Sequence, residues 1–190
     1  MGPRLSLVPA SRQAVRLNPL RQIARDAREL RLTRGELLRY LPEPRGVVIA
    51  RVALPDGREL VAGSTHCHNS RDSELVGREI ARAAGALLAA AGDRPAVLAG
   101  DLNVPPTHGA LSALHGGGWG SAGEARDVGI DRILHRGFEV VEAPRRLPPE
   151  EREVVVSWGG ASRRVRLSDH DPVTAVLRAS ASPAGPPEAR

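Results

Sequence analysis

Six acidic, amide and imidazole residues stand at the ends of short apolar runs in the last two-thirds of the chain. They are His66, Asp101, Asn103, Asp131, Asp169 and His170. The interior of a strand is buried, whereas its ends open onto loops where binding and catalytic groups are placed. Carboxylate and amide oxygens suit Mg²⁺ or Mn²⁺, and the same groups can hold a phosphoryl centre. We therefore expect these side chains to converge at one edge of a sheet and to line one cleft.

Taken one at a time, these residues have simpler explanations. An Asp in a Gly-Asp turn, such as Asp101, is more often a turn former. A lone His beside a strand, such as His66, is usually structural. The remaining histidines have no motif partner, and we interpret His68 and Asn69 as loop residues. Only the order and context of the whole set favour a shared site.

Hydrophobic patterns predict the elements that position these residues. Two β-branched runs flank the turn Pro55-Asp56-Gly57 and predict a hairpin of strands at 47–54 and 59–65. Apolar residues recur at helical spacing over 73–91, with Asp72 or Ser70 as a cap and Gly92 beyond the end. Further helices are expected at 20–32 and 107–115. Further strands are expected at 96–99, 130–134, 138–143, 154–158, 163–167 and 173–177.

Composition limits the class of protein. The chain has 190 residues, of which 41% are apolar and only 2% aromatic, so one domain with an aliphatic core is expected. All 27 basic residues are Arg, which we attribute to codon usage in a GC-rich bacterial genome. Cys67 is the single cysteine, which excludes an intramolecular disulfide. No signal peptide and no run of eighteen apolar residues is visible, so we expect a cytoplasmic protein without a transmembrane segment.

The charge balance bears on the partner. A net charge of +5 and a sequence pI of about 10.9 favour polyanions such as nucleic acid or anionic lipid headgroups. The arginines are scattered, and the scarcity of aromatic residues argues against a dedicated single-strand binder. The oligomeric state is not predicted by any sequence feature.

Four motifs occur in an order that resembles the endonuclease/exonuclease/phosphatase superfamily. They read STH, AGDLN, IDRIL and LSDHDPV, and they fall within residues 44–178. GDLN is similar to the GDFN motif of that superfamily, and SDHDPV to its SDHxPV motif. The superfamily includes pancreatic-type deoxyribonucleases, abasic-site endonucleases, inositol polyphosphate 5-phosphatases and bacterial sphingomyelinases.

The resemblance implies a role for each matching residue. His66 would contact the scissile phosphate or assist the leaving group, and Asp101 and Asn103 would orient the phosphate, the metal or the attacking water. Asp169, together with Asp101, would contribute to a Mg²⁺ or Mn²⁺ site. Asp131 and His170 would form a carboxylate–imidazole pair, in which the carboxylate fixes the tautomer and stabilises the imidazolium.

One part of the superfamily pattern is not visible. The superfamily carries an Asn at the end of its first strand and a metal-ligating Glu in an LQE-like context. Glu29, Glu36 and Glu43 do not follow apolar strand runs, so none receives that role. We expect an amino-terminal truncation, a mis-assigned start, or a divergent member with another ligand. If the chain begins at Met1, one sheet should be depleted and an apolar face exposed.

These observations lead to one set of predictions. The fold is α/β, a four-layer α/β/β/α sandwich of two mixed sheets, incomplete at its amino-terminal end. Residues 1–44 form an Arg-rich segment of uncertain structure, 45–178 the superfamily-like domain, and 179–190 a disordered tail. The function implied is a metal-dependent phosphoesterase, nuclease-like in preference. The alternatives are an impaired fragment that binds phosphate-containing ligands without turnover, and an Asp/His metal-binding protein without hydrolysis.

Overall fold

A computed structural model describes residues 5–70, 72–122 and 129–180. The first half of the chain contains β1 (Ser6–Leu7), β2 (Gln13–Arg16), α1 (Leu20–Glu29), α2 (Arg34–Tyr40), β3 (Gly46–Ala53), β4 (Glu59–His66) and α3 (Ser73–Ala91). The second half contains β5 (Ala96–Asp101), α4 (Gly109–Gly116), β6 (Gly120–Ser121), β7 (Asp131–Arg136), β8 (Phe138–Arg146), a 3₁₀ turn (Pro149–Arg152), β9 (Glu153–Trp158), β10 (Ala161–Arg166) and β11 (Val173–Ala179). The predicted α/β class is confirmed. Most of the tail predicted to be disordered lies outside the described residues.

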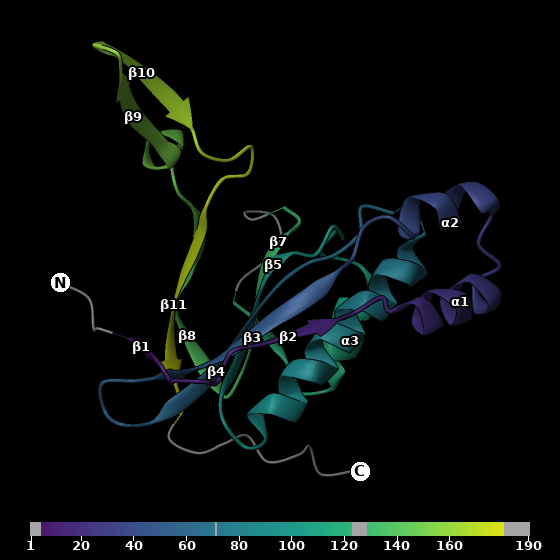
Figure 1. Ribbon diagram of the computed structural model, residues 1–190. Helices are drawn as coiled ribbons and strands as arrows, with labels where there is room; N and C mark the ends of the chain where they lie inside the picture. The colour runs from purple at the N-terminus through teal and green to yellow at the C-terminus, as the bar shows by residue number, and fades with distance from the viewer. Residues whose placement is uncertain (1–4, 71, 123–128, 181–190) are drawn as a thin grey trace.

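A seven-stranded mixed sheet forms the body of the molecule. Its order is β1-β3-β4-β5-β7-β6, with β2 also paired to β3. Strand β4 is parallel to β5, and the other pairs are antiparallel. Strands β3 and β4 form the hairpin that the Pro-Asp-Gly turn predicts. Strands β8 and β11 pair separately, and β9 and β10 form a hairpin that projects away from the body (Figure 1).

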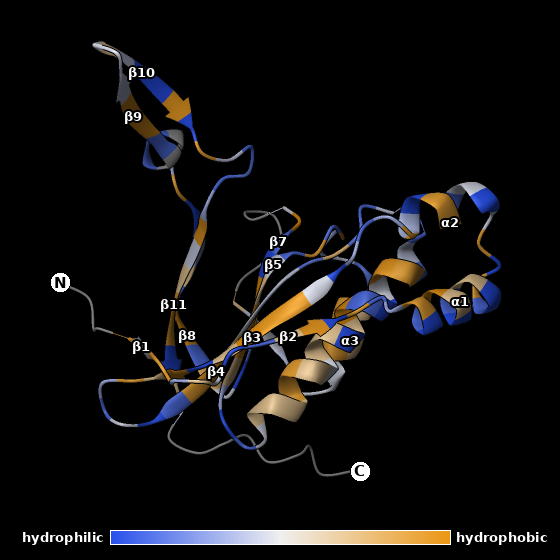
Figure 2. Cartoon of the chain, in the orientation of Figure 1, coloured by the Kyte–Doolittle hydropathy of each residue, from blue (hydrophilic) through white to orange (hydrophobic). Residues whose placement is uncertain are grey.

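Helix α3 covers one face of this sheet. Its buried residues include Ile80, Ala83 and Leu87, which pack against Val61 of β4 and Leu98 of β5. Figure 2 shows the apolar character of α3 and of β3, which lie against one another in the core. The apolar stripe predicted for residues 73–91 is therefore confirmed, and the Asp72 side chain caps the helix through the backbone N–H groups of Glu74 and Leu75.

The opposite face of the sheet is only partly covered. In the described residues the second sheet consists of β8 and β11, and an open cavity of about 430 Å³ separates it from the body at Leu60, Val97 and Leu177. Val48 on β3 is 55% exposed, as is Leu7 on β1. The predicted α/β sandwich is thus formed, and the described residues supply three of its four expected layers: a helical layer, the main sheet and the small sheet of β8 and β11.

Strands β7 and β8 follow one another around Gly137 but do not pair. Strand β7 stays in the main sheet beside β5, whereas β8 leaves it and pairs with β11. Gly137 has a φ of 74°, a backbone conformation that favours glycine. The chain therefore passes from one sheet to the other at this glycine, which places His170, just before β11, near β7.

Residues 13–45 are more ordered than their composition suggests. Besides β2 they form two helices, of which α2 begins with a capping box between Thr33 and Glu36. Helix α1 ends at Glu29, three residues before the predicted end. Among the described residues, no helix is both long and apolar enough to cross a membrane.

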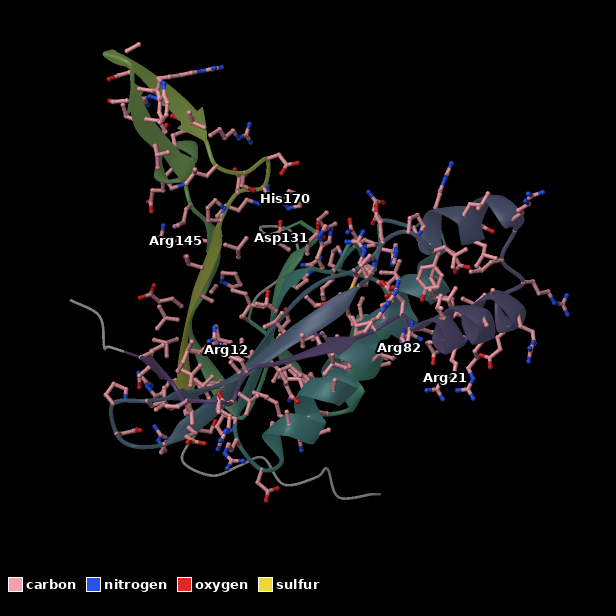
Figure 3. The ribbon with its side chains drawn as sticks, in the orientation of Figure 1. Arg12, Arg21, Arg82, Asp131, Arg145 and His170 are labelled. Atoms are coloured by element: carbon pink, nitrogen blue, oxygen red, sulfur yellow. The ribbon has the colours of Figure 1, made fainter. Side chains whose placement is uncertain are left out.

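A buried carboxylate fastens α1 and α2 to α3. Asp26 of α1 is 0% exposed and accepts hydrogen bonds from Tyr40 of α2 at 3.0 Å and Arg82 of α3 at 3.0 Å. Gln22 donates a third bond at 3.0 Å. Figure 3 shows Arg82 at the junction of α1 and α3. Burial alone would raise the pKa of Asp26, but the hydrogen bonds from Gln22, Arg82 and Tyr40 and the charge of Arg82 lower it overall.

We predict that Asp26→Asn lowers the free energy of unfolding at pH 7 by roughly 1–3 kcal/mol, because the donors Tyr40 and Arg82 lose a charged acceptor oxygen. The folded pKa of Asp26 lies below its ordinary value of 3.8, so the contribution is complete above that value. It is lost as the pH falls through the folded pKa. Urea unfolding from pH 7 to pH 3 should show the difference between variant and wild type shrinking only at the acid end. The exposed Glu139→Gln serves as control, and an equal effect of both substitutions would contradict the assignment.

Candidate functional site

Three of the predicted site residues lie in one row across the main sheet. His66 at the end of β4 pairs in register with Asp101 at the end of β5, and Asp101 pairs with Asp131 at the start of β7. Residues opposite one another on neighbouring strands point to the same face of a sheet. The three side chains therefore lie side by side, on the face opposite α3.

A glycine permits this row to form. Gly100 has a φ of 146°, and a Cβ atom on it would lie 1.8 Å from the carbonyl oxygen of Thr65 on β4. Any larger residue at position 100 would collide with the neighbouring backbone. The glycine of the GDLN motif is thus required for the close approach of β4 and β5 just before Asp101.

Asp101 is the central side chain of the site. Its Oδ1 accepts a hydrogen bond from the backbone N–H of Asn103 at 2.8 Å. Its Oδ2 lies 3.6 Å from Nε2 of His66 and 3.8 Å from Nε2 of His170. The Asp101 side chain is 14% exposed, so it faces both imidazoles from a largely buried position. Asn103 has a φ of 53°, and its Nδ2 donates to the carbonyl oxygen of Cys67 at 2.8 Å.

Asp131 and His170 form the predicted carboxylate–imidazole pair. Nδ1 of His170 lies 3.0 Å from Oδ2 and 3.2 Å from Oδ1 of Asp131, and Figure 3 shows the two side chains next to one another. The hydrogen bond to Asp131 and the charge of that carboxylate raise the pKa of His170. With Nδ1 bound to Asp131, the other ring nitrogen is directed toward Asp101.

A cavity of about 1220 Å³ opens beside these residues. The predicted site residues that line it are His66, Asp101, Asn103, Asp169 and His170. Its other wall comes from α2 and the segment that follows, including Tyr40 and Arg45. The structure therefore brings five of the six predicted residues to one cavity and joins the sixth, Asp131, to it through His170.

A small set of ligand atoms could hold a divalent cation. One oxygen each of Asp101 and Asp131 and one nitrogen of His170 lie within 4.8 Å of one another. Two carboxylates and an imidazole suit Mn²⁺ or Mg²⁺. Asp169 lines the cavity but is not part of this group.

The three glutamates that the sequence left without a metal role have other contacts. Glu36 is bound within the capping box of α2, Glu43 pairs with Arg45, and Glu29 pairs with Arg78. Glu36 and Glu43 nevertheless line the large cavity. None of the three belongs to the group of potential ligands among the described residues.

Sequence reasoning missed one pair beside the site. His68, interpreted as a loop residue, is 6% exposed, and its Nδ1 lies 2.7 Å from the Glu79 carboxylate. Glu79 is 0% exposed. It falls at helical spacing among Val76, Ile80 and Ala83, on the apolar stripe of α3. A carboxylate within an apolar stripe was the available signal, because a buried charge needs a partner.

Comparison with known proteins extends the result beyond the motifs. A model of the endonuclease/exonuclease/phosphatase family matches residues 10–170, so the match begins before the motifs and includes β2. Comparison with curated proteins gives no match.

Several solved structures share the fold. An endonuclease/exonuclease/phosphatase family protein from Bacteroides thetaiotaomicron aligns with a TM-score of 0.62 and 16% identity over 92% of this chain. D. rerio TDP2, complexed with single strand DNA product, aligns with a TM-score of 0.54 and 13% identity over 92% of this chain. The human Nocturnin catalytic domain, with bound sulfate anion, aligns with a TM-score of 0.54 and 14% identity over 72% of this chain.

This chain spans only part of those proteins. It covers 66% of the Bacteroides thetaiotaomicron protein, 69% of TDP2 and 51% of the Nocturnin domain. At these identities the likeness concerns the fold. The family model, in contrast, matches most of the sequence and contains the row of His66, Asp101 and Asp131. The resemblance predicted from the four motifs is confirmed: the chain belongs to the endonuclease/exonuclease/phosphatase family.

Proposed function

We propose that this chain is a divalent-metal-dependent phosphoesterase that uses water as its nucleophile. The observation that carries the proposal is the Asp131–His170 pair, whose imidazole faces Asp101 across 3.8 Å at the edge of a large cavity. Family membership supports hydrolysis of a phosphoester. The net charge of +5 supports a polyanionic substrate, so a nuclease-like activity is favoured.

The residues of the site have complementary tasks in this proposal. Asp131 holds the His170 ring in one tautomer and stabilises its protonated form, so His170 can accept a proton from water. His66 is 60% exposed at the cavity and can donate a hydrogen bond to a phosphate oxygen. The side-chain Nδ2 of Asn103 donates to the carbonyl oxygen of Cys67. The backbone N–H of Asn103 donates to Asp101 and so helps to fix the position of that carboxylate.

A divalent cation would be held by the carboxylates of Asp101 and Asp131, with Asp169 as a nearby oxygen donor that lines the same cavity, which leaves Nε2 of His170 free to accept the proton. When bound, such a cation neutralises charge that develops on phosphate oxygens. Asp101 and Asp131 then supply the negative charge that attracts it, while His66 remains available for the phosphate.

A second function remains compatible with the same geometry. The potential ligand group in the described residues contains three side chains and no glutamate. A site of this composition could bind a phosphate-containing ligand without hydrolysing it. Binding of inorganic phosphate in the presence of Mn²⁺, with no release of product from plasmid DNA or bis-p-nitrophenyl phosphate, would favour this alternative.

We predict that His170→Ala lowers the turnover of bis-p-nitrophenyl phosphate by roughly 100-fold or more, as expected for loss of a general acid–base group. The matched control is His115→Ala, which removes an exposed imidazole of α4 that does not line the cavity. The control should retain wild-type kcat with Mn²⁺ or Mg²⁺. Unchanged turnover in His170→Ala would remove the role given to the Asp131–His170 pair.

Metal binding can be tested without catalysis. We expect Asp101→Asn to weaken Mn²⁺ binding roughly 10-fold or more, since changes around metal sites commonly cost 10- to 100-fold in affinity. Titration calorimetry on the purified protein measures the dissociation constant directly. Asp56→Asn, in the exposed β3–β4 turn, should bind Mn²⁺ as the wild type does. Equal affinity of both variants would place the cation elsewhere.

A further inference from the structure

We propose that Glu79 is a positioning residue that holds the segment His66–His68 so that His66 faces Asp101. The proposal rests on the proposed function, because it assigns the geometry of that site to a residue outside it. Glu79 lies on α3, on the side of the sheet opposite the row of site residues. Its hydrogen bonds go to His68, in the chain that follows β4 and leads back to the site.

The Glu79 carboxylate holds His68 at two points. Oε2 accepts the backbone N–H of His68 at 2.9 Å, and Oε1 lies 2.7 Å from its Nδ1. Both residues are buried, with Glu79 0% and His68 6% exposed. Two bonds from one carboxylate to one residue fix the direction of the backbone as well as the ring.

The other side of the same segment is held by the site itself. The backbone N–H of Cys67 donates to the carbonyl oxygen of Asp101 at 2.9 Å. The carbonyl oxygen of Cys67 accepts from Nδ2 of Asn103 at 2.8 Å. Residues 67 and 68 are thus bound to β5 and its following loop on one side and to α3 on the other.

His66 depends on this backbone for its placement. Its imidazole is 60% exposed and 3.6 Å from the Asp101 carboxylate, which is longer than a hydrogen bond. Its own side-chain contacts are therefore weak, and the position of the ring follows from the chain on either side. On one side that chain is strand β4, and on the other it is the segment that Glu79 holds.

Glu79 is hard to explain by packing alone. It occupies a position on the apolar stripe of α3, where Leu75, Val76 and Ile80 are buried. An apolar side chain would fill this position without the cost of burying a carboxylate. Without Glu79, however, the buried backbone N–H of His68 would lose its acceptor. The carboxylate thus serves the segment that carries His66.

Tyr40 of α2 completes the surroundings of His68. The two rings meet edge to face, with centroids 4.8 Å apart. The negative charges of Glu79 and Asp26 and, above all, burial raise the pKa of Tyr40, so its hydroxyl stays protonated and donates to Asp26. His68 therefore lies between Glu79 of α3 and Tyr40 of α2.

The test compares Glu79→Gln with Asp26→Asn, using bis-p-nitrophenyl phosphate and Mn²⁺. Both substitutions neutralise a carboxylate that is 0% exposed, but only Glu79 contacts the segment after β4. We expect Glu79→Gln to lower kcat roughly 10-fold or more with KM changed less than 3-fold, because small misplacements of a catalytic group can cost about 100-fold. Asp26→Asn should lose thermal stability while its kcat stays within roughly 2-fold of wild type.

A second measurement does not depend on turnover. Imidazole ¹H–¹⁵N spectra should show changed His66 and His68 resonances in Glu79→Gln and unchanged His66 resonances in Asp26→Asn. Wild-type kcat and wild-type His66 resonances in Glu79→Gln would overturn the proposal. If the wild-type protein shows no turnover, the proposed function fails, and the spectra alone decide the role of Glu79.

If Glu79→Gln fails to fold, the variant His68→Phe tests the positioning role instead. It removes the side-chain half of the contact and leaves the backbone N–H of His68 bound to Glu79. We expect a shifted His66 resonance and a smaller loss of kcat than the roughly 10-fold loss above. Wild-type values of both would exclude a positioning role for this contact.

Discussion

Strands β4 and β5 lie parallel to one another, and their backbones approach closely at Gly100. Parallel strands end at the same edge of a sheet, so this pairing sets the last residue of each strand, His66 and Asp101, side by side. Strand β7 then adds Asp131 from the opposite direction. Two further features stabilise this pairing. Helix α3 covers one face of it, and the loop after β4 is hydrogen-bonded both to the end of β5 and to α3.

The two faces of the main sheet have different roles, one in stability and the other in the site. On the face covered by α3, Val61 and Leu98 are fully buried and pack with Leu87 of α3 in the main hydrophobic core. On the other face the apolar residues are partly exposed, and the polar site residues occupy the edge. The site therefore lies on a sheet whose other face is well packed against α3, while α2 and the segment after it form the opposite wall of the cavity. The cavity of about 1220 Å³ opens on the side of the sheet that carries the site residues.

Much of the site could be predicted from the sequence because its residues follow strong local signals. The β3–β4 hairpin and α3 have clear periodicity, and the motif residues stand at strand ends. Segments whose structure depends on distant partners were harder to predict. Strand β8 pairs with β11 and not with β7, and this choice depends on non-local contacts that no local pattern encodes.

The amino-terminal third and Glu79 show two other limits. The pattern Thr33-x-x-Glu36 is typical of a helix start. The short, Arg-rich α2 that follows it lacks the apolar stripe by which a helix is usually predicted. Helices α1 and α2 are fixed instead by the buried Asp26, whose partners come from three helices. Glu79 was visible in the sequence as a charge on an apolar stripe, yet its partner His68 could be identified only in three dimensions.

The part of the site next to the β8–β11 sheet should unfold locally at a lower free energy than the part on the main sheet. Strand β11 has no fully buried residue, and β8 has one, Pro144, whereas β4 and β5 are packed beneath α3. Regions with little buried surface open at lower free energy than the core. His170 belongs to this weaker unit, and Asp131 to the stronger one. Backbone amides around β11 should therefore exchange with solvent sooner than those of β5, and each such opening separates the imidazole from its carboxylate while the rest of the molecule stays folded.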